Sequence, residues 1–552
     1  MTDFVVHLSS VGWKSISSVD ASLSVRGCVY VDKDKISPDQ LAAVFGGWSD
    51  TELQSGLEKF NGFYALVKQD GMRLVAVVDL VRSIPLFYGQ HQGKLYLSDD
   101  AEWLRQQMDD HVMEAIASEE FQLVGYVTGR DTLFATVKQL QASECLVCTS
   151  GVDGVSVTLH RYYRFRYTEP QQYDVAELRA QLNTATLNSM KRLVDYANGR
   201  QIAIPLSGGY DSRLIATCLK NLNYDNVLTF TYGLPGNKQS QYSQQVAGAL
   251  GLKWYFVEYS KALWQQAWQT ELLKQYQAWA SGWSSIAHMQ DWLAVKILKE
   301  KGIVESGCIF VPGHGAGGFI PPDNAYPGVP ATAPDLQHAV FSLHYTLAPL
   351  HRVSHQPVSF WAQRIHSAAK ADGVIDGESF ASGYEIWEWQ ERQAKFTGNS
   401  VRVYEFFGYD WWLPLWDKEF VQSWEGVPLA VRKDRQSYYV GFVKDNYAAS
   451  ISAENKPESL GNASDNALMN LLVGLKLNQL KLVWKALHWG RLKLIGRVSP
   501  LAVEGRYPAG EYKRLAKEDY KGNGITAYFF LKFYRDLQES RQRSSARPAD
   551  EP

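Results

Sequence analysis

The sequence predicts a chain of two domains, a sheet-dominated α+β domain followed by an α/β domain built on a parallel sheet. Its 552 residues are too many for one ordinary domain. From Phe4 to about Tyr167 the sequence has short runs rich in β-branched and aromatic residues, such as 63–67, 74–78 and 94–97, which polar turns separate. Beyond residue 200, strand-like runs alternate with helical segments.

The α/β prediction rests on that alternation. Strand-like runs at 201–206 and 227–232 alternate with segments of helical period at 213–221 and 242–250. Such alternation is typical of a parallel sheet with crossover helices. The later part of the chain is mostly helical in period and rich in tryptophan from Trp361 to Trp424. These rings would suit stacking on sugars, but we expect most of them to fill the core.

The domain boundary is expected between the two patterns. Residues 168–173 contain a proline and two glutamines, as a linker does, and residues 175–197 have helical apolar spacing. We therefore assign residues 1–167 to the first domain. Residues 175–540 form the second, with a helical C-terminal part, and the polar residues 541–552 are expected to be a disordered tail.

Composition excludes several classes of protein. Lys plus Arg (56) nearly balances Asp plus Glu (58), and no long basic run occurs, so we expect no nucleic-acid partner. No apolar stretch approaches the ~20 residues of a membrane helix, and residues 1–10 lack the pattern of a signal peptide. Five scattered cysteines fit a reducing compartment. We expect a cytoplasmic protein that does not act in a membrane.

One pair of cysteines has the spacing of half a zinc site. Cys145 and Cys148 are separated by two residues, but no second pair or histidine cluster completes four ligands. The alternative, which we favour, is a short β-strand in which both cysteines simply fill positions.

The segment Ser207-Gly-Gly-Tyr-Asp-Ser212 has the features of a phosphate-binding loop. It follows an apolar strand and precedes a helix, so its glycines let the backbone approach a phosphate, and the helix N-terminus adds positive potential. Ser207 can donate a hydroxyl hydrogen bond, and Asp211 can hold Mg²⁺ that bridges to phosphate oxygens. No lysine follows the second glycine, which disfavours a Walker A loop and favours pyrophosphate. An ordinary strand-to-helix turn is the alternative.

This loop, with Leu206 before it, resembles the pyrophosphate loop of the asparagine synthetase family. The resemblance implies an α/β parallel-sheet ATP-pyrophosphatase domain (PP-loop, adenine nucleotide alpha hydrolase-like) after an α+β Ntn-hydrolase-like domain. It implies ATP and Mg²⁺ as cofactors, with the metal on Asp211. The residues expected to bind the nucleotide are Leu206, Ser207, Gly208, Gly209, Asp211, Ser212, Thr231, Gly233, Gly313 and His314.

Two later segments extend the resemblance. Leu413-Pro-Leu-Trp-Asp417 resembles the family's Val-Pro-Phe-Leu-Asp segment, although we slightly favour Asp417 as a helix N-cap or turn residue. Asn455-Lys-Pro457 stands where the family has an active-site lysine region, so Lys456 is the candidate catalytic residue. A solvated loop lysine is the alternative for Lys456.

The first domain resembles the family's glutaminase domain but lacks its nucleophile. Residues 60–65 resemble the family's Leu-x-Gly-x-Phe-Ala strand, and residues 79–88 resemble its Arg-Asp-x-x-Gly-x-x-Pro-Leu-Tyr-Tyr motif. The family attacks glutamine with an N-terminal cysteine whose own amino group is the base, and here position two is Thr2. Arg26-Gly-Cys28 replaces the glutamine-binding Asn-Gly-Glu, and Cys28 is internal. Thr2 as an N-terminal nucleophile is the alternative to a domain without glutaminase activity.

A further departure concerns the metal. Residues 310–319 stand where the family has Leu-Ser-Gly-Asp-Gly-Ala-Asp-Glu-x-Phe, and Gly317 replaces the second acidic residue, which helps to bind magnesium. Asp323 or a water would have to substitute for it. His314 replaces the first acidic residue and either contacts phosphate or has a structural role.

The sequence thus predicts an ATP-dependent, AMP-forming ligase that joins a small-molecule or sugar carboxylate to ammonia or an amine, in a chain that could form a homodimer. Which carboxylate is used cannot be inferred from the sequence; aspartate and a surface-polysaccharide uronate are both candidates. A catalytically inactive nucleotide-binding scaffold is the rival that Thr2 and Gly317 suggest. A tRNA-modifying enzyme is a second rival, which the balanced charge disfavours.

Overall fold

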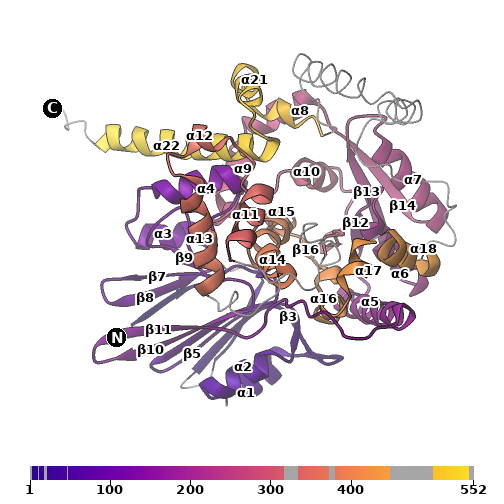
Figure 1. Ribbon diagram of the computed structural model, residues 1–552, viewed down its shortest axis with the longest axis horizontal. Coiled ribbons are helices and arrows are strands. Elements are labelled where there is room, and N and C mark those ends of the chain that lie inside the picture. Colours follow the sequence, from indigo (N-terminus) through magenta and orange to yellow (C-terminus); the bar gives the residue numbers. More distant parts are fainter. Residues whose placement is uncertain are drawn as a thin grey trace.

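The computed structural model describes residues 3–9, 12–17, 21–46, 48–315, 333–371, 380–434, 436–447 and 501–545. As predicted, a β-rich half comes first in the chain and a half with a parallel sheet follows. Figure 1 shows the first at the lower left and the parallel sheet at the right. The expected helix at 175–197 is confirmed as α5 (Val175–Ala197), which Asp174 caps by accepting from the N–H groups of Ala176 and Glu177.

The strands of the front half form two sheets. One has the order β1-β8-β7-β9, and the other has the order β11-β10-β6-β5-β3-β2, with β4 paired to β3. Adjacent strands are antiparallel except β1 and β8, which are parallel. The strands are β1 (Phe4–His7), β2 (Trp13–Ser17), β3 (Ala21–Val31), β4 (Asp34–Ile36), β5 (Phe60–Asp70), β6 (Arg73–Val78), β7 (Phe87–His91), β8 (Lys94–Ser98), β9 (Lys138–Gln139), β10 (Glu144–Gly151) and β11 (Gly154–Arg161).

Side-chain alternation arranges this half in four layers. One face of the larger sheet, with Leu66 and Val77, packs against α1 (Pro38–Gly46) and α2 (Asp50–Leu57). Its other face packs on the smaller sheet, whose outer face meets α3 (Ala101–Gln107) and α4 (Ala115–Val124). A helix–sheet–sheet–helix order follows, in agreement with the expected α+β domain.

Cys145 and Cys148 both lie in strand β10, as the favoured interpretation predicted. Cys145 packs in the outer layer with α1 and α2, whereas Cys148 packs between the two sheets. Burial raises the pKa of the Cys148 thiol to about 12. Because the two thiols lie on opposite faces of the sheet, the half-zinc-site interpretation is wrong for this pair.

The second half contains a five-stranded parallel sheet, which confirms the α/β prediction. Its order is β14-β13-β12-β15-β16. The strands are β12 (Ile202–Pro205), β13 (Val227–Gly233), β14 (Lys253–Glu258), β15 (Ile309–Phe310) and β16 (Asp410–Trp411). The strand order reverses between β12 and β15, and such a switch point opens a crevice at the carboxyl ends of the strands.

The two predicted crossover helices begin earlier than the sequence pattern indicated. Helix α6 (Tyr210–Asn221) begins directly after Gly209, and α7 (Lys238–Leu250) begins after Asn237, whose side chain accepts from the Ser240 N–H. Polar residues in the first turns hid these starts from apolar periodicity.

The remaining described elements are helices. They are α8 (Lys261–Trp268), α9 (Glu271–Ser281), α10 (Trp292–Glu300), α11 (Ala333–His344), α12 (Leu350–Val353), α13 (Val358–Ala371), α14 (Phe380–Trp387), the π-helix η1 (Glu388–Thr397), η2 (Gly398–Val401), α15 (Arg402–Phe406), η3 (Pro414–Trp416), α16 (Lys418–Glu425), α17 (Leu429–Lys433), η4 (Gln436–Val440), α18 (Gly441–Tyr447), η5 (Val503–Arg506), α21 (Ala509–Lys517) and α22 (Gly522–Ser545). Some of them, such as α12 and α22, pack on α4 of the front half. None of the helices in the described ranges has the length and hydropathy of a membrane crossing.

Helix α22 corrects one predicted boundary. The disordered tail was expected from residue 541, but the helix continues to Ser545, because glutamine, glutamate and arginine in its last turns are good helix formers. Residues 546–552 lie outside the described residues.

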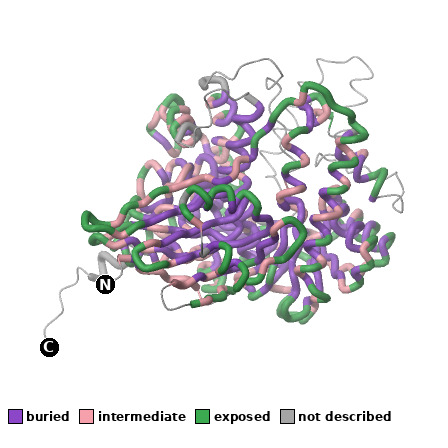
Figure 2. The backbone as a smooth tube through the Cα atoms, turned by 90° about the horizontal axis from the view of Figure 1, so that it is seen from below, coloured by how far each residue is buried: buried purple, intermediate pink, exposed green. Residues whose placement is uncertain are grey.

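The two halves share one core. Phe63 of β5 meets Trp412 edge-on, with 4.8 Å between ring centroids, and both belong to the largest cluster of buried side chains. Figure 2 shows that buried stretches of backbone occur throughout the molecule. Trp361, Trp389, Trp412 and Trp416 are all less than 2% exposed. The expectation that most tryptophans of this region fill the core is confirmed.

A buried ion pair crosses this shared core. Arg192 of α5 donates to both carboxylate oxygens of Asp417, at 2.6 and 2.7 Å, and Asn61 of β5 donates to the same carboxylate at 3.2 Å. Asp417 also accepts from the Glu419 N–H, so it is the N-cap of α16, as the alternative interpretation held. The two segments that carried the resemblance, around Asn61 and around Asp417, therefore contact each other.

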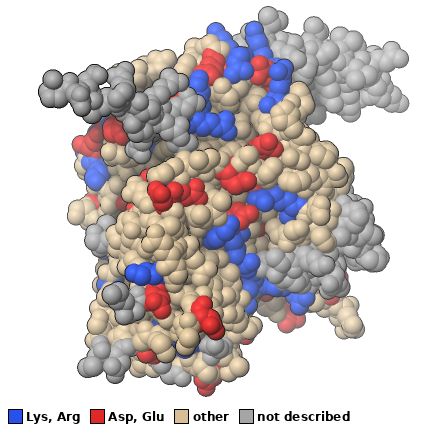
Figure 3. All heavy atoms as spheres, turned by 90° about the vertical axis from the view of Figure 1, so that its left-hand side faces the viewer, with Lys and Arg blue, Asp and Glu red and all other residues tan. Residues whose placement is uncertain are grey.

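Both signs of charge lie side by side on the face shown in Figure 3, as the balanced composition suggested for the surface.

Replacing Asp417 by Asn is expected to destabilise the protein strongly. The substitution removes the buried carboxylate that binds Arg192 through two oxygens and leaves only the part-exposed Glu419, at 3.0 Å, to meet the charge, which costs about 3 kcal/mol. Chemical denaturation of the purified protein measures the effect. The matched control is Asp410→Asn, which breaks an exposed pair with Arg200 and should cost less than about 1 kcal/mol. Equal losses in the two variants would contradict the assignment of Asp417 as a buried link.

Candidate nucleotide-binding site

The predicted phosphate loop lies at the switch point of the parallel sheet. Residues 207–212 leave the carboxyl end of β12 and enter α6, whose N-cap is Gly209 with φ −74° and ψ 166°. In the described part of the chain no side chain caps this helix end. The N–H groups of its first turn, together with the positive end of the helix dipole, therefore face outward as an anion site.

Hydrogen bonds within the loop hold its shape. The Ser207 N–H donates to Ser212 Oγ at 3.1 Å, and the Gly209 N–H donates to Ser207 Oγ at the same distance. The two hydroxyl oxygens lie 3.3 Å apart. Both serines thus fix the turn before any ligand is present, which lowers the entropic cost of binding one.

Glycines allow the neighbouring chain to approach the loop. A Cβ atom on Gly313 would lie 2.8 Å from the Ser212 backbone nitrogen, and one on Gly208 would touch the Tyr242 ring at 3.4 Å. Gly313 belongs to the segment after β15. The structure therefore brings the two predicted parts of the site, 206–212 and 313–314, directly together.

Thr231 and Gly233 support the loop from β13. Thr231 Oγ1 donates to the Leu206 carbonyl at 2.7 Å and lies 2.6 Å from Ser243 Oγ, in the buried interior. Gly233 ends the strand with φ 137°, and its carbonyl accepts from the Tyr259 N–H. The Thr231 hydroxyl holds the ends of β12 and β13 together, so its side chain stabilises the site from below.

Asp211 stands in the first turn of α6 and has a partner that the sequence did not reveal. The hydroxyl of Tyr439, a fully buried residue of η4, donates to Asp211 Oδ1 at 2.6 Å. The two residues are 228 positions apart. No local pattern signals such a contact.

His314 is the first residue after Gly313, and its environment keeps it neutral. Its Nδ1 lies 2.9 Å from Ser400 Oγ, and its ring centroid lies 6.1 Å from that of His288. Burial, together with repulsion by His288, lowers the pKa of His314 to about 4. At neutral pH it offers hydrogen bonds rather than a positive charge.

A buried carboxylate lies behind His288. Asp291 accepts hydrogen bonds from the hydroxyls of Tyr232 and Tyr404, the latter at 2.6 Å, and lies 3.8 Å from His288 Nε2. Burial opposes ionisation, but His288 and the two tyrosines outweigh it and lower the pKa of Asp291 to about 2. Sequence reasoning missed this group, although an acidic residue at the start of an apolar helix is a visible signal.

Several sequence-based predictions concern residues that the structure does not describe. Lys456, Gly317, Asp323 and Thr2 lie outside the described residues. Within the described ranges, no group of three or more histidine, cysteine, aspartate or glutamate side chains is placed to hold a metal ion.

The segment Arg26-Gly-Cys28 is part of strand β3. Burial raises the pKa of the Cys28 thiol to about 11, so it is a protonated core residue. Arg26 forms ion pairs with Asp99 and Glu405. The Asp99 partner of Arg26 directly follows strand β8. The backbone carbonyl of Asp3 accepts from the Leu95 N–H at the beginning of the same strand, so Arg26 and Asp3 lie near opposite ends of β8.

Comparison with known proteins gives one family and several distant folds. Residues 184–302 match the family model of asparagine synthase. No curated protein matches the sequence. An NH3-dependent NAD synthetase from Campylobacter jejuni aligns at 14% identity over 41% of this chain and 97% of its own, with a TM-score of 0.21.

Two other solved structures are similar at the same low level. An NMN synthetase from Francisella tularensis aligns at 15% identity over 41% of this chain and 97% of its own, with a TM-score of 0.19. A glutamine phosphoribosylpyrophosphate amidotransferase from B. subtilis aligns at 13% identity over 55% of this chain and 57% of its own, with a TM-score of 0.14. At such scores these likenesses carry no weight, and the family model is the finding that counts.

The matched residues contain β12, the phosphate loop, α6, β13 and most of the cluster around Asp291. The segment that carries the phosphate loop is therefore similar to asparagine synthase, and Gly313 and His314 lie beyond the matched residues.

Proposed function

We propose that this chain activates a carboxylate with ATP and passes the acyl group to ammonia or an amine, forming an amide, AMP and pyrophosphate. The observation that carries the proposal is the lysine-free loop at 207–212, whose helix N-terminus faces the crevice at the switch point of a parallel sheet. A site of this kind suits a pyrophosphate group better than transfer of a terminal phosphoryl group.

In this reaction a carboxylate oxygen attacks the α-phosphorus, and the bond from that phosphorus to the bridging oxygen breaks. Pyrophosphate leaves, and the N–H groups of the first turn of α6 stabilise its charge. The nitrogen nucleophile then attacks the acyl carbon and loses a proton, and AMP departs with the electron pair of the broken bond. The loop thus acts on the leaving group of the first step.

Magnesium fits this scheme through Asp211. Mg²⁺ is usually held by one or two carboxylates together with substrate phosphates and waters, so one carboxylate beside the loop is sufficient. When bound, the ion would neutralise charge on the phosphates. Tyr439 donates to one oxygen of Asp211 and so fixes the orientation in which the carboxylate meets the ion.

His314 would contribute a neutral hydrogen bond. With a pKa of about 4 it is uncharged at neutral pH, and Ser400 fixes its ring. A neutral imidazole beside the loop can donate to a phosphate or acyl oxygen, but it does not replace a metal-binding carboxylate.

The front half is proposed to act as a scaffold without glutaminase activity, because Thr2 stands where the family has its cysteine and Arg26-Gly-Cys28 replaces the glutamine-binding motif. The second substrate would then be free ammonia or an amine. The carboxylate is proposed to be a small molecule such as aspartate or a sugar uronate.

A second candidate function is an inactive nucleotide-binding scaffold. The observation that favours it is His314, a neutral residue at a position where the family pattern has an acid. Binding of ATP without any pyrophosphate release would support this candidate over the ligase.

Pyrophosphate release should depend on one carboxylate and on Asp211. The purified protein is incubated with ATP, magnesium, ammonium and a panel of carboxylates that includes aspartate and uronic acids, and pyrophosphate and AMP are measured. Asp211→Ala should lose the activity, whereas Asp225→Ala, an exposed acid before β13, should keep it. Production of ADP and phosphate instead would contradict the mechanism.

Tyr439→Phe should lower kcat/KM for ATP about tenfold or more, since a hydrogen bond to a charged group contributes roughly 1.5–3 kcal/mol. The variant removes only the hydroxyl that Asp211 accepts from. A titration with magnesium should show weaker apparent metal affinity. Unchanged kinetics would mean that Tyr439 does not orient Asp211.

His314 should make the protein less stable in mild acid. Its folded-state pKa of about 4 lies below the ordinary 6.5, so between these values the unfolded chain binds a proton that the folded chain does not. Stability therefore falls as pH falls through this window. Melting temperatures at pH 7.5 and pH 5 should differ less in His314→Gln than in the wild type, whereas the exposed His351→Gln should match the wild type. Identical slopes in all three proteins would contradict the assignment.

A further inference from the structure

A small cavity of about 20 Å³ lies between the front half and the second half of the molecule. Arg26, Arg82 and Asp99 line it from the front half, and Asn399 and Arg402 line it from the other side. It is separate from the phosphate loop, none of whose residues line it. Three arginines around one small space are an unusual concentration of buried positive charge.

Two of these arginines are paired and one is not. Arg26 forms ion pairs with Asp99 and Glu405, and Arg402 pairs with Glu405 as well. Arg82 is 3% exposed, and its Nε donates to the Leu140 carbonyl at 2.8 Å. Among the described residues Arg82 has no ion pair, and its Nη2 is buried without a hydrogen-bond partner. The cavity is thus lined by a guanidinium whose charge no carboxylate meets directly.

The Phe87 ring does not account for the burial of this charge. It lies 5.4 Å from Arg82 Cζ, a cation–π contact that contributes about 2 kcal/mol when it is buried. Removing a cation from water costs several kcal/mol even in a relaxed protein. Among the described residues no carboxylate forms a direct ion pair with Arg82, although Glu391, Asp79 and Glu144 attract it from a greater distance.

The acidic groups nearby have hydrogen-bond partners other than Arg82, and those of Asp79 are neutral donors that leave its charge in place. Asp99 accepts from the N–H and Oγ of Ser9 and from Trp13 Nε1, at 2.6–2.8 Å. Buried Asp79 accepts from the N–H groups of Tyr64, Val81 and Ser83. Burial, with repulsion from Arg402, lowers the pKa of Arg82 to about 9, although nearby acids oppose the shift.

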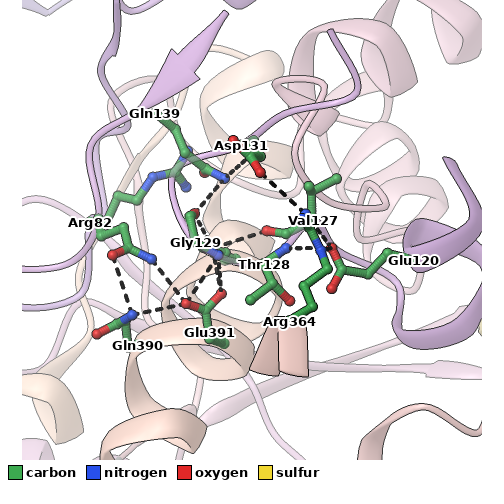
Figure 4. A network of polar contacts seen from close by, with 12 residues as sticks. Arg82, Glu120, Val127, Thr128, Gly129, Asp131, Gln139, Arg364, Gln390 and Glu391 are labelled. Carbon is green, nitrogen blue, oxygen red and sulfur yellow. Dashed lines mark hydrogen bonds and ion pairs between the residues drawn. The ribbon is translucent and has the colours of Figure 1, made fainter. Parts of the chain in front are cut away.

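Figure 4 shows Arg82 beside a network of polar contacts whose acids also have their own partners. Glu391 pairs with Lys395 at 2.5 Å, and Glu120 accepts from Arg364 at 2.9 Å. Glu391 also accepts from Gln141 and Gln390. This network joins the two halves of the molecule without supplying a counter-ion to Arg82.

The backbone of Arg82 is a second sign that its side chain is retained for a purpose. Its φ is 52°, in the left-handed region, which costs a residue with a Cβ about 1–2 kcal/mol. In the motif that residues 79–88 resemble, glycine stands at the position of Arg82. Glycine would hold this turn without strain and would bury no charge. Arginine at position 82 therefore lowers stability through its backbone conformation and again through its buried charge. A strained residue that is retained despite this cost points to a function.

We propose that the cavity binds one small monovalent anion of the size of chloride, with Arg82 as its principal ligand. A space of about 10–15 Å³ admits a water molecule, so this cavity holds a single atom or a group of very few atoms and excludes an amino-acid or sugar carboxylate. The anion supplies the direct partner that the Arg82 guanidinium lacks among the described residues.

The bound anion also connects the two halves. Arg82 reaches it from the front half, while Asn399 and Arg402 belong to η2 and α15 of the second half. Ser400, next to Asn399, contacts His314 at the nucleotide site. Occupancy of the cavity therefore stabilises the segment that holds His314, independently of the reaction proposed above.

The test is thermal unfolding of the full chain in chloride, bromide or gluconate at constant ionic strength. The melting temperature should rise with chloride or bromide and reach a plateau, whereas gluconate, which the cavity cannot admit, should give no such rise. Arg82→Gly removes the charge and the backbone strain and should abolish the halide response. Arg200→Ala, at an exposed arginine outside the cavity, should retain it.

A crystal of the wild-type protein grown in bromide gives a readout that depends on no variant. An anomalous peak within hydrogen-bonding distance of Arg82 is expected. The proposal is overturned by a water molecule in that place, by equal responses to halide and gluconate, or by a halide response that Arg82→Gly leaves unchanged.

Discussion

The close approach of two loops at the switch point is the constraint on which the candidate site depends. Gly313 lies so near the Ser212 backbone that a single added Cβ would clash at 2.8 Å. Because β12 and β15 are neighbours in the sheet, the loops that leave their carboxyl ends must share this space. The helix N-terminus of α6, the serine hydrogen bonds and His314 all take their positions from that contact.

The front half and the ligase half are held together by polar groups inside a common core. Asp417 accepts from Arg192 and Asn61 and caps α16, so one carboxylate links α5, β5 and the segment after β16. Buried charges of this kind stabilise only when each is paired. The front half therefore keeps a structural role that does not depend on glutamine chemistry, which agrees with the buried thiol of Cys28.

Features that depend on neighbouring residues, such as helix bounds and glycine turns, could be predicted from the sequence. Helix α5 has the expected bounds, and the glycines at 208, 209 and 313 stand where the backbone needs them. The partners of Asp211 and His314 could not be predicted, since Tyr439 and Ser400 are 228 and 86 residues away in the sequence. The predicted role of Thr231 stays a prediction, although its hydroxyl is engaged with the Leu206 carbonyl. The predicted start of the tail at residue 541 was wrong, because polar residues that are good helix formers continue α22 to Ser545.

The central claim is that the phosphates of ATP lie on the first turn of α6, between Gly208 and Asp211. A crystal structure of the full chain with α,β-methylene ATP and magnesium tests it most directly. We predict phosphate oxygens within hydrogen-bonding distance of these backbone N–H groups, and the metal ion on Asp211. Phosphates bound elsewhere, with the loop empty, would contradict the account.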